Sequence, residues 1–127
     1  MTLSAEQLDQ LKGADVTSSD GQPVGEVEGI YLDETSGEPE WALVKTPWIG
    51  KRDTFVPLKD ATIEQGTLRV PHSRDRLQGA PAIDPDGALS EREEAELYSY
   101  YGLPYPQKPG FRITRYYDLF PARRLWS

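Results

Sequence analysis

The sequence predicts a mainly β protein: a small β-barrel or strongly bent sheet with short flanking helices and an extended C-terminal tail. Three observations support this fold class. The chain has 127 residues, which is the size of one ordinary domain. Six short segments with strand-like patterning follow one another within roughly sixty residues, a density typical of small barrels. Helix starts led by a serine lie on both sides of this region.

The N-terminal segment is predicted to form a short helix. Ser4 can cap its first turn, Gln7 occupies the capping-box position, and Gly13 ends it. The spacing of apolar residues then changes to a period near two, which indicates strands. We expect strands at residues 15–17, 23–32, 41–46, 54–56, 61–64 and 67–70.

Two glycines, Gly25 and Gly29, interrupt the longest predicted strand. Glycine inside a strand suggests a bulge or a close backbone approach, as at the corner of a barrel. We expect the apolar side chains of the strands to meet in one core. The predicted core residues are Val27, Ile30, Leu43, Val44, Phe55, Val56, Ile63, Leu68 and Val70.

A second helical region follows the predicted barrel. Ser73 can cap a short turn that runs to Leu77, and residues 79–87 read as an extended strap. Ser90 then caps a helix that ends at Gly102, and Glu93 occupies its capping-box position. The first turns of this helix hold several acids, which we expect to form a solvated face. These acids are Glu91, Glu93, Glu94 and Glu96. The predicted segments are an N-terminal helix, a barrel, an acidic helix and a tail, at residues 1–13, 14–83, 84–103 and 104–127.

Charge is distributed unevenly along the chain. Acids outnumber bases by 21 to 14, for a formal net charge of −7. Residues 1–103 carry a net charge of −11, whereas residues 104–127 carry one acid and five bases, net +4. Because an acidic body repels phosphate, we expect no direct DNA binding. The tail also holds six of the thirteen aromatic residues, which makes it a candidate interaction segment.

The composition excludes several classes of chemistry. The absence of Cys rules out disulfides, thiolate catalysis and cysteine zinc sites, and one His cannot build a multi-histidine metal centre. We expect no cofactor and no metal. No apolar run reaches the roughly 20 residues of a membrane span, and the first residues lack the features of a signal peptide. A soluble cytoplasmic protein is expected.

One stretch has partial calcium-loop spacing. If Gly87 is the sixth loop position, Asp84, Asp86 and Glu93 fill positions three, five and twelve. Ala82 then stands at position one, where an acidic ligand is normally essential. A Pro-Asp-Gly turn that feeds a capped helix is the better interpretation.

The single histidine does not indicate a catalytic triad. His72 stands next to Ser73 and three residues before Asp75. A triad needs the imidazole between the other two groups in space, which neighbours on one loop do not easily provide. We therefore interpret His72 as a surface or half-buried residue.

Several short motifs follow one another along the chain in a characteristic order. Residues 23–33 read PVGEVEGIYLD, residues 35–44 read TSGEPEWALV, and residues 55–58 read FVPL. This succession of a Gly-x-Val strand, a Thr/Gly/Pro hairpin, a return strand and a Val-Pro-Leu step resembles the PRC-barrel family. Residues 68–71, 79–84 and 89–103 are similar to a version common in actinobacterial proteins, in which an acidic helix ending in Tyr-Gly follows the barrel. The resemblance covers roughly residues 12–103.

The resemblance implies a docking role without catalysis. The family is known from the photosynthetic reaction-centre H subunit and from the C-terminal domain of the ribosome-maturation factor RimM, where the barrel belongs to a larger assembly. The membrane anchor of the H subunit is absent here, and residues 104–127 match nothing familiar.

Two segments are candidate partner sites. The loop with Trp48 and Arg52 either folds over an open barrel end or docks a partner, because Trp and Arg are enriched at interface hot spots. The tail either wraps on the acidic body or binds a partner, and we favour the partner. On this interpretation, the barrel should stay folded without residues 104–127. The candidate partner-binding residues are Trp48, Arg52, Phe111, Arg112, Arg115, Tyr116, Tyr117, Phe120, Arg123, Arg124 and Trp126.

Three functions follow as hypotheses. The first is a non-catalytic scaffold or assembly module whose tail docks on a protein partner or on a second copy. The second is an RNA-linked factor of the ribosome-maturation kind, which would use the tail's bases. The third is peripheral association with a membrane or photosynthetic-type complex through the tail's arginines and Trp126. An enzyme is the least supported class.

Overall fold

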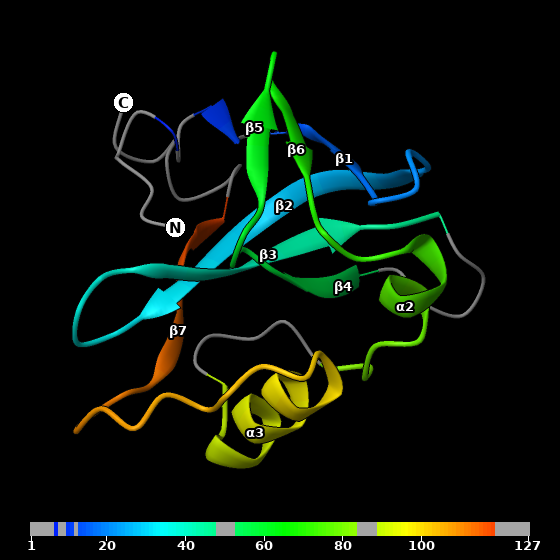
Figure 1. The fold of residues 1–127 in the computed structure, drawn as a ribbon. Coiled ribbons are helices and arrows are strands. Elements are labelled where there is room, and N and C mark those ends of the chain that lie inside the picture. The colour runs from blue at the N-terminus through cyan, green and yellow to red at the C-terminus, as the bar shows by residue number, and fades with distance from the viewer. Residues whose placement is uncertain (1–6, 8–9, 12, 48–52, 84–88, 119–127) are drawn as a thin grey trace.

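Figure 1 shows the fold as a computed structural model, which describes residues 7, 10, 11, 13–47, 53–83 and 89–118. Strands form most of the regular secondary structure among the described residues, and two short helices accompany them, which confirms the predicted mainly β class. The elements are β1 (Asp15–Thr17), β2 (Pro23–Asp33), β3 (Pro39–Lys45), β4 (Asp53–Pro57), β5 (Thr62–Glu64), β6 (Thr67–Arg69), α2 (Arg74–Gln78), α3 (Glu91–Tyr100) and β7 (Ile113–Asp118). Most of the helix predicted near the N-terminus lies outside the described residues.

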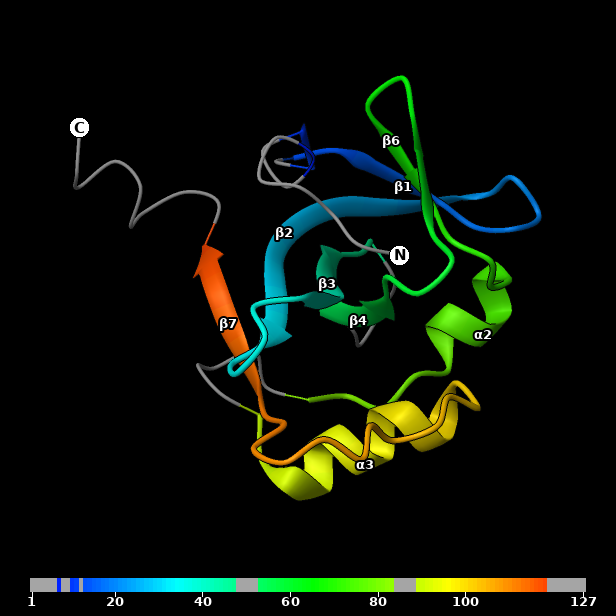
Figure 2. The ribbon, with the colours of Figure 1, turned by 60° about the vertical axis from the view of Figure 1, so that its left-hand side comes forward.

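The strands form one strongly curved sheet. Its order is β4-β3-β2-β1-β6-β5, and β7 also pairs with β2. All neighbouring strands are antiparallel except β1 and β6, which are parallel. Figure 2 shows that β2 bends around β3 and β4. This long strand therefore organises the sheet.

The glycines of β2 explain its curvature. The register between β2 and β3 shifts between Val27 and Gly29, as expected for a bulge. At Gly25, a Cβ atom would lie 2.0 Å from the backbone oxygen of Lys45. The close backbone approach that the sequence predicted at this strand is therefore confirmed.

The predicted core is largely confirmed. Eight of the nine predicted residues are buried, and Ile63 is only partly buried because it lies on the short hairpin of β5 and β6. Tyr31 and Trp41 add large rings to the core, and Tyr31 packs edge-on against Phe55 with centroids 4.9 Å apart. The core thus rests on β2, β3 and β4.

Strand β7 is an element that the sequence analysis did not predict. It runs antiparallel to β2 over residues 29–33. On that edge of β2, β1 pairs only with residues 23–26, and β3 occupies the opposite edge. Strand β7 therefore covers the second half of an edge that would otherwise be open to pairing with other chains. The predicted extended tail is thus part of the sheet over Ile113–Asp118.

Both predicted helix caps after the barrel are present. Ser73 caps α2 by accepting a hydrogen bond from the Arg76 N–H. At α3, the Ser90 hydroxyl accepts from the Glu93 N–H at 3.1 Å, and the Glu93 carboxylate accepts from the Ser90 N–H at 2.9 Å. These local signals were sufficient to predict where each helix begins.

Candidate functional site

Glu94 on α3 does not lie on a solvated face. Its exposed fraction is 0 %, whereas Glu91 and Glu96 on the same helix are exposed. The prediction of a solvated acidic face is therefore wrong at this position. Leu97 and Tyr98, three and four residues later, are buried and lie on the same side of the helix as Glu94. Glu94 consequently faces the barrel.

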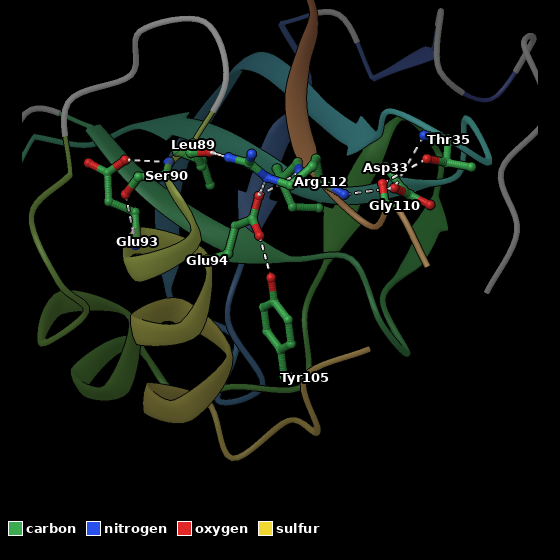
Figure 3. A network of polar contacts seen from close by, with 10 residues as sticks. Asp33, Thr35, Leu89, Ser90, Glu93, Glu94, Tyr105, Gly110 and Arg112 are labelled. Carbon is green, nitrogen blue, oxygen red and sulfur yellow. Dashed lines mark hydrogen bonds and ion pairs between the residues drawn. The ribbon is translucent and has the colours of Figure 1, made fainter. Parts of the chain in front are cut away.

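Three donors compensate the buried carboxylate of Glu94. The Arg112 Nε donates to Oε2 at 3.0 Å, and the Ile113 N–H donates to the same oxygen at 2.8 Å. The Tyr105 hydroxyl donates to Oε1. A buried charge is costly unless it is paired and hydrogen-bonded, and this arrangement meets both conditions. All three donors belong to the C-terminal segment, so Glu94 attaches that segment to α3 (Figure 3).

Arg112 and Ile113 also bond to Leu89, two residues before α3 begins. A terminal nitrogen of Arg112 donates to the Leu89 carbonyl, and the Leu89 N–H donates to the Ile113 carbonyl at 2.9 Å. Arg112 is 38 % exposed at its side chain, so its outer face remains hydrated. The pairing with Glu94 raises the pKa of Arg112, which stays charged.

A second carboxylate, Asp33 at the end of β2, holds the other side of Arg112. It accepts hydrogen bonds from the N–H groups of Thr35, Ser36 and Arg112. Burial alone would raise the pKa of Asp33, but the hydrogen bonds from Ser36, Arg112 and Thr35 outweigh it and lower the pKa. The Glu34 N–H donates to the Arg112 carbonyl at 2.7 Å. The hairpin between β2 and β3 is thus hydrogen-bonded to Arg112, the residue just before β7.

We call Asp33, Glu94, Tyr105, Arg112 and Ile113 the C-terminal clasp. Next to it, rings from α3 and the C-terminal segment pack edge to face. Phe111 contacts Tyr105 and Tyr98 at centroid distances of 5.6 Å and 6.0 Å, and Tyr98 contacts Trp41 at 5.1 Å. The Tyr98 hydroxyl donates to Glu40 at 2.8 Å. The polar residues of the clasp therefore lie beside a cluster of packed aromatic rings.

The structure places some predicted partner residues inside the molecule. Phe111 is buried and Arg112 belongs to the clasp, so both serve the intramolecular wrap that the sequence analysis considered less favoured. Arg115 lies over the Tyr31 ring at 5.6 Å. Tyr117 pairs with Ile30 in the β2–β7 ladder. Tyr116 lies in the same strand.

The other candidates lie outside the described residues. They are Trp48, Arg52, Phe120, Arg123, Arg124 and Trp126. Their assignment to a partner site therefore stays a prediction.

A pair of acids lies away from the clasp, on strands that flank β3. Glu28 on β2 and Asp53 on β4 hydrogen-bond to each other. Burial raises the pKa of Glu28, and the hydrogen bond and charge of Asp53 raise it further, to about 7. Lys45 and Arg115 oppose this shift. Glu28 therefore changes its charge near neutral pH.

The remaining candidates for metal binding or catalysis either have structural roles or lie outside the described residues. Within the described residues, no three His, Asp or Glu side chains gather as a metal site requires. Asp84 and Asp86 lie outside those residues, and Glu93 caps α3. His72 is half-buried, as the sequence predicted, and its ring packs on Tyr101 with centroids 5.0 Å apart. Neither α2 nor α3 has the length and hydropathy needed to span a bilayer, nor does any other helix in the described part.

Comparison with known protein families matches residues 5–77 to the PRC-barrel domain, which is more than half of the chain. The chain belongs to the PRC-barrel family. No curated protein matches it. The PRC-barrel match includes β1 to β6 and ends within α2, so α3, β7 and most of the clasp lie beyond the matched residues. The match confirms the family resemblance inferred from the sequence for the barrel, and it does not extend to residues 79–103.

Sequence reasoning missed Glu94 and β7, although both left signals. Glu94 stands three residues before Leu97 and four before Tyr98, the spacing of one helical face. Residues 111–117 contain β-branched and aromatic side chains with partial alternation, which is typical of a strand. The tail's prolines, positive charge and aromatic content directed attention to an extended partner-binding segment instead.

Proposed function

We propose that this PRC-barrel chain is a non-catalytic assembly module that docks a protein partner through residues 119–127. One observation carries the proposal. The clasp and the β2–β7 ladder hold residues 105–118 on the barrel, so the segment that follows starts from a defined place at the end of β7. A docking segment that starts from a rigid element loses less freedom on binding.

The composition of residues 119–127 suits a protein surface. The segment reads LFPARRLWS and combines Phe120 and Trp126 with two arginines. Trp and Arg are among the residues that most often dominate binding energy at protein interfaces. No cofactor is needed for this role.

The RNA and membrane alternatives have less support. Both would depend on the tail's bases, but Arg112 is paired with Glu94 and Arg115 lies over the Tyr31 ring. Lys108, Arg123 and Arg124 remain as the tail's other bases. Affinity for phosphate scales with the number of phosphate charges that a protein neutralises. Because Arg112 and Arg115 already have contacts within the chain, fewer cations are left for RNA or lipid phosphates, which weakens both alternatives.

Site-specific photo-crosslinking in cells tests the proposal. A photoreactive residue replaces Leu125 inside the segment, and a matched control replaces Glu64, which is exposed on β5. We expect a discrete protein adduct from position 125 and none from position 64. Equal adducts from both positions, or adducts that nuclease removes, would contradict a protein-docking segment.

Point variants identify which side chains carry the docking. An aromatic anchor is worth about 2 kcal/mol or more, whereas an exposed ion pair is worth about 0–1 kcal/mol. Trp126→Ala should therefore reduce the adduct more than Arg123→Ala does. A larger loss with Arg123→Ala would favour the RNA or membrane alternative.

A further inference from the structure

A groove of about 480 Å³ lies where β1, β2 and β6 adjoin, away from the clasp. Apolar residues form much of its lining, namely Pro23, Val24, Gly25 and Pro47. Two carboxylates, Asp15 and Glu26, and one base, Arg74, are its charged groups. Hence this groove offers an apolar floor beside exposed negative charge.

The two acidic residues of the groove occupy opposite positions on neighbouring strands. Asp15 and Glu26 are directly opposite in the β1–β2 ladder, and both are exposed. Like charges at opposite positions of a strand pair are destabilising. Lys45 neighbours Glu26 on the β3 side, whereas the other neighbour of Asp15 is the uncharged Thr67. A cationic occupant would relieve this repulsion, and an anionic one would increase it.

Strand β7 leads toward this end of the sheet. Its last residue, Asp118, pairs with Gly29, three residues from Glu26 along β2, which is roughly 10 Å. The sheet edge ahead is occupied, because Val27 donates to the Ala14 carbonyl and β1 begins at Asp15. The edge of β2 beyond Asp118 is therefore not free to pair with a continuation of β7.

The segment that follows is long enough and complementary in charge. Residues 119–127 are nine residues, which extend to roughly 30 Å at most. They carry Arg123 and Arg124 and no acidic side chain, together with Phe120 and Trp126. Apolar rings match the floor of the groove, and the arginines match Asp15 and Glu26.

We infer that the groove is the docking site of the chain's own residues 119–127, with the arginines against Asp15 and Glu26. The inference rests on the proposed function only in treating this segment as a docking element. An intramolecular site of this kind would compete with the partner for the same segment, so partner binding requires release from the groove.

Paramagnetic relaxation measurements on the full chain test the inference directly. The sequence contains no Cys, so Ser127→Cys provides one attachment point for a nitroxide. We expect the label to reduce the amide signals of Thr17, Gly25 and Thr67 at least twofold, and to leave those of Thr35 and Ser36 in the β2–β3 hairpin unchanged. Undiminished signals at the groove would overturn the inference.

Charge variants test the role of the acid pair, and the spectrum itself shows whether each variant is folded. In Asp15→Asn/Glu26→Gln the groove signals should recover at least half of their lost intensity. The matched control Glu34→Gln/Glu38→Gln neutralises two exposed acids elsewhere and should leave the effect intact. Full attenuation in the groove variant would contradict recognition by this pair.

Isotope mixing distinguishes the chain's own segment from that of a second copy. A ¹⁵N-labelled chain without nitroxide is mixed with an unlabelled chain that carries it. We expect no attenuation in this mixture, and attenuation would overturn the intramolecular site in favour of exchange between copies. No partner takes part in these measurements. If they exclude the groove, the crosslinking result at Leu125 still stands, and if crosslinking finds no partner, the groove result still stands.

Discussion

Replacement of Glu94 tests whether the clasp holds the C-terminal segment. Glu94→Ala removes three hydrogen bonds to a fully buried carboxylate and leaves the N–H of Ile113, whose exposed fraction is 0 %, without its acceptor. Breaking a buried ion pair costs about 3–5 kcal/mol. Arg112 is 38 % exposed and regains water, so we expect the lower half of that range, about 3–4 kcal/mol.

Glu94→Gln separates the hydrogen bonds from the charge. The amide oxygen can still accept from Arg112 and Ile113, and the Tyr105 hydroxyl can turn to accept from the amide nitrogen. The loss is then that of charge-assisted bonding, about 1–2 kcal/mol. Glu96→Gln on the exposed side of α3 is the matched control and should stay within about 0.5 kcal/mol of the unmodified protein.

Urea denaturation gives the free energy of unfolding of each variant, and amide hydrogen exchange at Ile113 gives the local effect. We expect the order Glu94→Ala, Glu94→Gln, Glu96→Gln from most to least destabilised, with protection at Ile113 falling in the first two. A Glu94→Ala protein as stable as the control would refute the clasp. So would equal losses for the Ala and Gln variants, since the charge and the hydrogen bonds would then not be separable.

Three further predictions concern the whole fold. A chain that ends at Leu103 lacks β7 and the buried Phe111 and Ile113, each worth about 1.5–3 kcal/mol, so it should melt well below a chain that ends at Asp118, the reverse of the expectation from sequence alone. Gly25→Ala should cost at least about 3 kcal/mol in urea denaturation because its Cβ would lie 2.0 Å from the Lys45 oxygen, whereas Gly21→Ala meets no atom within 4 Å and should cost about 1 kcal/mol through its positive φ. The raised pKa of Glu28 destabilises the fold progressively from about pH 4.5 to about 7, so Glu28→Gln should raise the melting temperature at pH 8 and leave it unchanged at pH 4; an equal gain at both pH values would contradict the shift.

What the sequence could predict depended on how local the determining interactions are. The cap of α3 involves Ser90 and Glu93, three residues apart, and it was predicted correctly. The role of Glu94 depends on Arg112, which is 18 residues away, and on a strand whose partner is β2. The helix pattern alone does not reveal such a partner. The family motifs supplied the barrel because they encode long-range pairing that periodicity cannot.

The tail shows that a functional site is also hard to predict where it depends on contacts between distant parts of the chain. Its positive charge and aromatic content indicated an interaction segment, but composition does not tell whether the interacting surface belongs to the same chain. Phe111 and Arg112 turned out to contact α3 and the β2–β3 hairpin. Sequence analysis therefore recognised the kind of segment and favoured the partner over the intramolecular wrap that its first half adopts.

The position of the clasp indicates why a polar anchor is used where an apolar one would be at least as stable. A slip of one residue between β7 and β2 would turn every side chain of β7 to the opposite face. It would also move the Ile113 N–H away from Glu94 and the Arg112 N–H away from Asp33. A buried ion pair often adds little net stability compared with apolar packing, but it penalises each wrong alignment by leaving a charge unpaired. We infer that the clasp sets the register of β7, and with it the position of Asp118, after which residues 119–127 begin.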